Sequence, residues 1–322
     1  MELGVSTGAG IDGDLRTLRA CAQQRMVTEH ILALADQAGY GAVLIDADPS
    51  ATPGTLDLPG PLVSGGTDPR VITWAQFAHT IRAAMRGLSR RGVRESDTVG
   101  IFVHDAIRHV VAVHAVRAAG ALAAPLGPTR DAADIAARLK DCRTRLLITS
   151  APLAELAIEA AERSWVRQVF AFGEAEGTTP FGSLLHTAKH GQTHPADRAG
   201  LTDGAGAAGP GGGRAGAGRE VIDGPAAARM PDLAGFGLDG PVPGLTSRDV
   251  VVAAPPCGDP DAYTALLDLT LAAGATLVAA PLPQVDAAVA AYKGTAAIVP
   301  RGTDVPGLHA GRVLTVGLRR RR

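Results

Sequence analysis

The sequence predicts an α/β fold in which parallel sheets are covered by helices. Two observations lead to this prediction. Apolar stretches of strand length alternate with stretches of helical periodicity between residues 73 and 190, and the same alternation resumes between 249 and 316. Strands that alternate with helices are joined by crossovers, which favours parallel pairing. The length of 322 residues allows roughly two domains or subdomains.

Residues 1–70 are expected to form an irregular N-terminal segment that leads into the α/β fold. Thr28–Gly39 has the composition of a short helix, and Ala42–Asp46 is a short apolar strand. Pro53–Pro69 is rich in turn-forming residues, so we expect little regular structure there.

A first α/β subdomain is expected at residues 71–190. After Thr73, a suitable N-cap, large apolar residues recur at steps of three and four, which predicts an amphipathic helix that ends before Gly92. The later elements follow in alternation. Strands are expected at 98–103, 122–126, 145–149 and 166–172, and helices at 105–119, 131–142, 153–163 and 181–190.

The composition changes after residue 190. Fourteen of the forty glycines lie between Gly200 and Gly244, which predicts a Gly/Pro-rich loop or linker over 191–247. A second α/β segment follows at 248–318, and 319–322 form a basic tail. In that segment we expect strands at 249–254, 276–280, 296–299 and 312–316, and helices at 261–273 and 285–292.

Composition and charge exclude several classes of partner. The 31 basic and 32 acidic residues give a net charge of -1, so no nucleic-acid or anionic-membrane partner is expected. The most apolar run, Ala262–Pro283, contains Asp268, Gly274 and Pro281 and is not expected to span a membrane. Three widely separated cysteines and no signal-like segment favour the cytoplasm.

The residues by themselves predict no catalytic or metal site. Gly204, Gly206 and Gly209 form GxGxxG, but neither an apolar strand before it nor a helix after it is expected, and the chain contains no Gly-Lys pair for a Walker A loop. A flexible linker of the same composition is the competing interpretation. The histidine sets 104/109/114 and 186/190/194 are not expected to bind metal, because the first set cannot share one helical face and Gly191 interrupts the second.

A resemblance to a known family comes from long ordered stretches. The run VITWAQFAHTIRAAMRGLSRRGVRESDTVGIFVHDAIRHVVAVHAVRAAGALAAPLGPTRD and its continuation to Leu185, and then Leu245–Val316, resemble the N-terminal region of adenylate-forming enzymes. The chain looks most like the coumarate CoA ligase branch of the acyl and aryl CoA synthetases. The resemblance implies an N-terminal domain of two subdomains and, where the family activity survives, the cofactors ATP with Mg²⁺ and CoA.

The chain departs from this family at the phosphate loop, which has the form SGTTGxPKG. The matching stretch places alanine at the three hydroxyl positions and Gly211 at the lysine position. A charge-assisted contact from lysine to phosphate therefore has no side-chain substitute. The resemblance assigns the degenerate loop to Gly206, Gly209, Gly211 and Gly212.

Two further departures concern the substrate and the missing motifs. Cys257, Gly258 and Asp259 stand where the family usually has an aromatic pair and a histidine at the acid pocket, and Asp259 would repel a carboxylate. The chain ends at RVLTVGLRRRR, before the family's adenine, ribose and magnesium motifs and its C-terminal domain, which we therefore expect to be absent.

These observations predict a catalytically degenerate N-terminal portion of an acyl or aryl CoA synthetase-like protein. It would bind a small carboxylic acid or acyl ligand, or dock a protein partner or a second copy at the truncated sheet edge. Two alternatives remain open: an active AMP-forming carboxylate CoA ligase completed by a second polypeptide, and a non-functional remnant with a shifted reading frame over 201–244.

Overall fold

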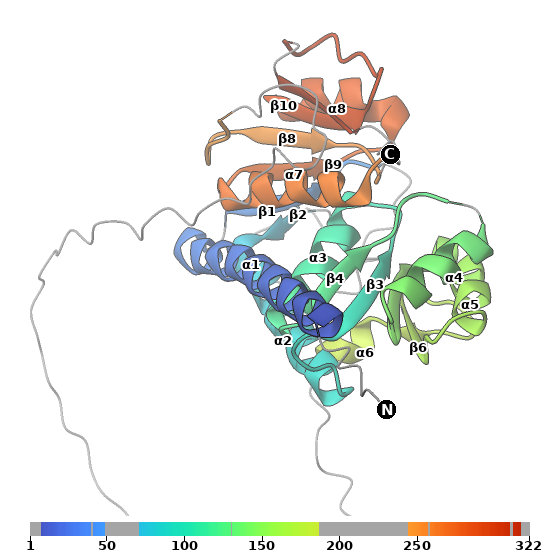
Figure 1. Cartoon of the computed structure of the whole chain (residues 1–322). Coiled ribbons are helices and arrows are strands. Elements are labelled where there is room, and N and C mark those ends of the chain that lie inside the picture. Colours follow the sequence, from blue (N-terminus) through green and yellow to red (C-terminus); the bar gives the residue numbers. More distant parts are fainter. Residues whose placement is uncertain are drawn as a thin grey trace, which may run out of the picture.

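The predicted α/β fold is confirmed by two sheets with helices packed against them (Figure 1). The computed structural model describes residues 8–39, 41–48, 71–129, 131–186, 244–256, 258–309 and 312–316, with side chains described from residue 21 onward. Each sheet carries helices on both faces, and the most extensive buried core connects the two sheets.

The first sheet is entirely parallel, in the order β4-β3-β5-β6-β7. Its strands are β3 (Thr98–Phe102), β4 (Leu122–Pro125), β5 (Leu146–Ser150), β6 (Gln168–Phe172) and β7 (Thr179–Pro180). Neighbouring residues point to opposite faces. Phe102 and Leu147 therefore join the cluster with α4 (Ala132–Asp141) and α5 (Ala154–Glu162), whereas Ile101 and Ile148 face the larger core with α3 (Ala106–Ala118).

The second sheet has the order β11-β10-β8-β9-β1-β2. Its strands are β1 (Ala42–Asp46), β2 (Val71–Thr73), β8 (Val250–Ala253), β9 (Thr276–Ala279), β10 (Ala296–Pro300) and β11 (Val313–Val316). All pairs are parallel except β1 with β2. Helix α7 (Pro260–Ala272) packs on the face toward the main core, and α8 (Val285–Tyr292) covers the other.

Helix α2 (Trp74–Arg90) begins as its sequence predicts. Thr73 Oγ1 accepts a hydrogen bond from the backbone N–H of Gln76 at 3.2 Å, and Gln76 Oε1 accepts one from the N–H of Thr73 at 2.9 Å. This reciprocal pair satisfies two backbone donors at the start of the helix. Past the helix end, Gly92 has φ +86°, a conformation that favours glycine.

Helix α1 (Gly8–Ala38) is much longer than the helix expected from Thr28 to Gly39. The expected start was wrong because residues 14–38 contain no proline or glycine and many strong helix formers, so no local signal stops the helix at Thr28. The strand expected at Ala42–Asp46 is confirmed as β1, and it lies in the sheet of the C-terminal strands, between β2 and β9.

Two shorter elements also differ from expectation. Helix α6 (Gly182–Leu185) is a single turn, whereas a helix over 181–190 was expected; residues 187–190 of that range lie outside the described residues, as do 191–243. Strands β2 and β7 were not predicted, because two or three residues carry too little periodicity to show a strand. The division of the chain into domains stays a prediction.

Within the described ranges, no helix combines the length and apolar character needed to cross a membrane.

Candidate functional site

The loops that follow four strands, two from each sheet, lie close together. A β-carbon placed on Gly127, after β4, would lie 3.6 Å from the carbonyl oxygen of Gly258 and 3.6 Å from Cδ of Pro260, both after β8. The loops after β1 and β3 approach each other as well, since Asp46 is within electrostatic reach of Asp105 and Arg108. We call residues 46–48, 103–105, 126–129 and 254–259 the loop junction; residue 257 lies outside the described residues. In open α/β sheets, ligands bind beyond the carboxyl ends of the strands.

One side of the loop junction carries several acidic groups. Asp105 caps α3 by accepting a hydrogen bond from the N–H of Arg108 at 2.7 Å, and its other oxygen pairs with Arg108 Nη1 at 2.9 Å. Asp46 Oδ1 accepts the N–H of Asp48 at 3.0 Å. Burial raises the pKa of Asp46 above its usual value, and the nearby charges of Asp105 and Asp48 raise it further. A cation or a hydrogen-bond donor would be favoured beside Asp46.

The other side carries two of the three residues expected at an acid pocket. Gly258 has φ +63°, a left-handed conformation that lets the chain turn into α7. Asp259 is buried and caps α7: its Oδ1 accepts the backbone N–H groups of Asp261 at 3.0 Å and Ala262 at 3.1 Å. The carboxylate thus lies at the positive end of the helix dipole, which offsets part of the repulsion that it would exert on a carboxylate ligand.

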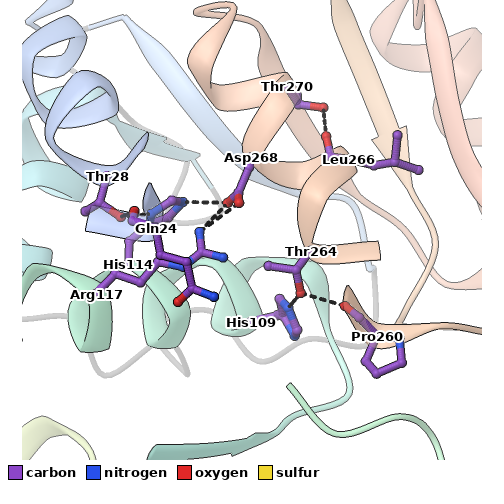
Figure 2. Close-up of polar contacts among 10 residues, drawn as sticks. All are labelled: Gln24, Thr28, His109, His114, Arg117, Pro260, Thr264, Leu266, Asp268 and Thr270. Atoms are coloured by element: carbon purple, nitrogen blue, oxygen red, sulfur yellow. Dashed lines mark hydrogen bonds and ion pairs between the residues drawn. The ribbon is translucent and has the colours of Figure 1, made fainter. Parts of the chain in front are cut away.

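Buried hydrogen bonds connect α7 to the end of β8 and to α3 on this side of the loop junction. Figure 2 shows those of Thr264 with His109 and Pro260. Tyr263 donates its hydroxyl to the carbonyl of Ala254 at 2.7 Å, which ties α7 to the end of β8. Thr264 Oγ1 donates to the carbonyl of Pro260 at 2.7 Å, so it must accept from Nε2–H of His109 at 2.8 Å. Burial lowers the pKa of His109 to about 3, in agreement with a neutral ring that carries its proton on Nε2.

A second buried network joins helices α1, α3 and α7 (Figure 2). Arg117 Nη1 contacts both oxygens of Asp268, at 2.9 and 2.7 Å, and both side chains are almost fully buried. His114 bridges the helices, with Nε2 at 3.5 Å from Asp268 and Nδ1 at 2.9 Å from the hydroxyl of Thr28. Burial and the charge of Arg117 lower the pKa of His114, so Arg117 is the cation that compensates Asp268.

Part of the chain matches a known protein family. Residues 60–199 match the AMP-binding enzyme family. That range contains the whole β3–β6 sheet segment and two of the four loops of the loop junction. No curated protein matches the chain.

Solved structures with a similar fold include acyl and aryl CoA ligases. A long-chain-fatty-acid-CoA ligase from Archaeoglobus fulgidus matches with a TM-score of 0.58 and 17% identity, over 85% of this chain and 51% of that one. An anthranilate CoA ligase solved with anthranoyl-AMP gives 0.57 and 17%, over 88% and 54%. A benzoate CoA ligase from Burkholderia xenovorans LB400 gives 0.54 and 16%, over 85% and 50%. The chain therefore spans about half the length of the structures that it resembles.

The expected phosphate loop of the AMP-binding match is not part of the described structure. Gly206, Gly209, Gly211 and Gly212 lie outside the described residues, as does Cys257. Among the residues that are described, no three His, Cys, Asp or Glu side chains are grouped to hold a metal ion.

The sequence reasoning missed the groups on the other side of the loop junction. Asp46, Asp105 and Arg108 were not singled out, although Asp46 is the last residue of one apolar strand and Asp105 lies three residues after another. That position was the available signal, because parallel strands bring their carboxyl ends to one edge. What the sequence could not supply is that β1 and β3, which belong to different sheets, place these loops together.

Proposed function

We propose that this chain is the N-terminal portion of an AMP-binding protein of the acyl or aryl CoA synthetase type, nearest to the coumarate branch, that has lost adenylation. It keeps the scaffold and binds a small carboxylic acid or acyl ligand at the loop junction, or docks a partner at the edge of β11. ATP with Mg²⁺ and CoA are cofactors of the active family and not of this chain. We place the protein in the cytoplasm, since its three cysteines suggest no disulfide framework.

The observation that carries this proposal is the composition of the phosphate loop. Ala205, Ala207 and Ala208 stand where the family has hydroxyls, and Gly211 stands at the lysine position. Backbone N–H groups alone can still approach a phosphate. They lack the charge-assisted contact that gives tight binding of a triphosphate.

The described part of the loop junction supports one element of this proposal, the loss of tight nucleotide binding. Its carboxylates are Asp46, Asp48, Asp105 and Asp259. They outnumber the two guanidinium groups nearby, those of Arg108, which pairs with Asp105, and of Arg138, whose Nη1 lies 3.6 Å from a β-carbon placed on Gly127. Such a set repels the phosphates of a nucleotide unless a cation lies between them. A ligand with a neutral or donor group toward Asp46 fits better than a free triphosphate.

We expect the purified chain to give no ATP–pyrophosphate exchange with a panel of aryl and fatty acids. The reason is that exchange requires a tightly bound triphosphate, and the loop offers neither hydroxyl nor ammonium donors. A complete acyl CoA ligase measured in parallel is the positive control. Robust exchange by this chain would instead identify it as an active ligase and would overturn the proposal.

A variant with a restored loop tests the assigned cause. Ala205→Ser, Ala207→Thr, Ala208→Thr and Gly211→Lys together return the missing donors. We expect Mg-ATP to stabilise this variant, by about 2.7 kcal/mol at a hundredfold excess over Kd, and to leave the parent chain unchanged. Thermal unfolding with and without Mg-ATP measures both. Equal stabilisation of the parent chain would show that glycine backbone alone binds the nucleotide.

Association at the β11 edge is a further part of the proposal. β11 pairs only with β10 within the described sheet, so its other backbone edge has no strand partner there. Its apolar side chains Leu314 and Val316 are buried, at 8% and 2% exposure, which leaves backbone hydrogen bonding as the driving contact. We expect light scattering to show a mass that rises with protein concentration. A constant monomer mass would contradict the association.

A further inference from the structure

A cavity lies where α6 packs against the end of α2. Figure 1 shows the position of these two helices. Its volume is about 390 Å³, and it is lined by Gly87, Arg90, Arg91, Ser183 and His186. This volume lies within the range of small-molecule sites, roughly 300–1,000 Å³. The lining brings two guanidinium groups, an imidazole and a hydroxyl to one place.

The packing of the two helices is close and depends on a glycine. A β-carbon placed on Gly87 would come within 2.7 Å of two backbone carbons of Leu184 and would also clash with its carbonyl oxygen. No side chain larger than hydrogen fits at this position without moving α6. The floor of the cavity is therefore rigid backbone on both sides, which fixes the groups around it.

The two arginines at the rim are held in place by contacts that leave their charge uncompensated. Arg90 Nη2 donates to the carbonyl of His186 at 2.9 Å and to that of Leu184 at 3.4 Å. The guanidinium carbon of Arg91 lies 5.5 Å from the centre of the buried Phe170 ring. Among the residues that the structure describes, neither arginine forms an ion pair with a carboxylate. Two fixed cations side by side favour an anion.

The two remaining polar side chains of the lining differ in what they can offer an anion. His186 Nδ1 donates to the carbonyl of Gly182 at 2.8 Å, so Nε2 of a neutral ring is an acceptor and adds no donor. The hydroxyl oxygen of Ser183 is buried and has no hydrogen-bond partner among the described groups. A buried hydroxyl without a partner costs free energy, which a bound oxyanion would recover.

We propose that this cavity binds the phosphate group of a small phosphorylated molecule. Arg91 supplies the charged donors, because Nη2 of Arg90 already donates to two carbonyls. The Ser183 hydroxyl donates to another phosphate oxygen. Arg and phosphate match in geometry, since a planar guanidinium can donate two parallel hydrogen bonds. The cavity is larger than a phosphate ion alone, which leaves room for an organic substituent.

Phosphorus NMR titrations of the full chain test the assignment, with inorganic phosphate and phenyl phosphate as probes. We expect Arg91→Gln to weaken binding of both probes about tenfold and Ser183→Ala about threefold. Arg86→Gln is the matched control, because Arg86 is exposed on the same helix and does not line the cavity. The affinity of the Arg86→Gln variant for both probes should stay within about twofold of that of the parent chain. Circular dichroism confirms that each variant is folded.

The two probes also distinguish the source of the phosphate group. Tighter binding of phenyl phosphate supports an organic phosphate as the ligand, and equal binding supports recognition of free phosphate. The proposal is overturned if neither probe binds saturably, if Arg91→Gln leaves the affinity unchanged, or if Arg86→Gln weakens binding as much as Arg91→Gln does. The last result would indicate diffuse attraction to a basic helix end.

Discussion

Replacement of Arg117 by methionine should lower the free energy of unfolding by about 3–5 kcal/mol. Arg117 Nη1 contacts both oxygens of Asp268, and the two residues are each only 5% exposed. Without the guanidinium, Asp268 remains buried between α3 and α7, next to a His114 ring that is disfavoured as a cation. An uncompensated charge in that position is among the costliest single changes in a protein interior. Urea unfolding followed by circular dichroism measures the loss.

Two controls separate the buried charge from the loss of side-chain packing. Arg82→Met removes a pair of the same geometry, because Arg82 Nη2 contacts both oxygens of Asp36 at 2.9 and 2.7 Å. Those side chains are 40% and 59% exposed, so the expected cost is below about 1 kcal/mol. The double variant Arg117→Met/Asp268→Leu should recover most of the stability lost in the single variant, because no buried charge remains. A single Arg117→Met that costs no more than Arg82→Met would contradict this account.

Acidic pH should destabilise the fold steeply, and His109 should account for a definable part of the loss. Burial lowers the pKa of His109 in the folded chain to about 3, whereas in the unfolded chain the ring has its ordinary value of about 6.5. Below pH 6.5 the unfolded state therefore binds a proton that the folded state excludes. The stability from His109 is complete above pH 6.5 and is lost as the pH falls toward 3, by about 1.4 kcal/mol for each pH unit. His114 has a lowered pKa as well and acts in the same direction.

The variant His109→Gln isolates this contribution. Glutamine places an N–H donor where Nε2 of His109 meets the Thr264 hydroxyl, and it does not titrate. Between pH 6.5 and pH 4, the free energy of unfolding of the variant should fall less steeply than that of the parent chain, by about 1.4 kcal/mol per pH unit. His79→Gln is the control, because it makes the same substitution at an exposed position on α2. Equal slopes for His109→Gln and the parent chain would show that His109 is protonated in the fold.

The predictions that succeeded were those that depend on residues close in sequence. The expected N-cap, Thr73, lies three residues from Gln76, whose backbone N–H it accepts. Helical and strand periodicity are read over comparably short windows. The alternation of elements therefore appeared correctly from β3 to α5 and again from β8 to β10, with boundaries that shift by at most one residue.

In the candidate site, by contrast, most contacts join residues that are far apart in sequence. Gly258 and Asp259 were identified by resemblance, and the structure gives Asp259 a helix-capping contact that no motif announced. The pairing of His109 with Thr264 joins residues 155 apart, and the contact of Arg90 with His186 joins residues 96 apart. The spacing of residues along one helix does not predict these long-range hydrogen bonds, because each bond joins two different elements of the fold.

By itself, the sequence determined the α/β class, the N-cap at Thr73, and the absence of lysine and hydroxyls from the expected phosphate loop, since each is a property of a short stretch. Only the tertiary structure decided that β1 pairs with β9 across more than 230 residues, and that Arg117 meets Asp268. It also decided that α6 lies on Gly87 to form a basic cavity. The physical reason is that strand order and buried charge pairing depend on which apolar faces meet when the two sheets pack, and many long-range arrangements satisfy the same local pattern.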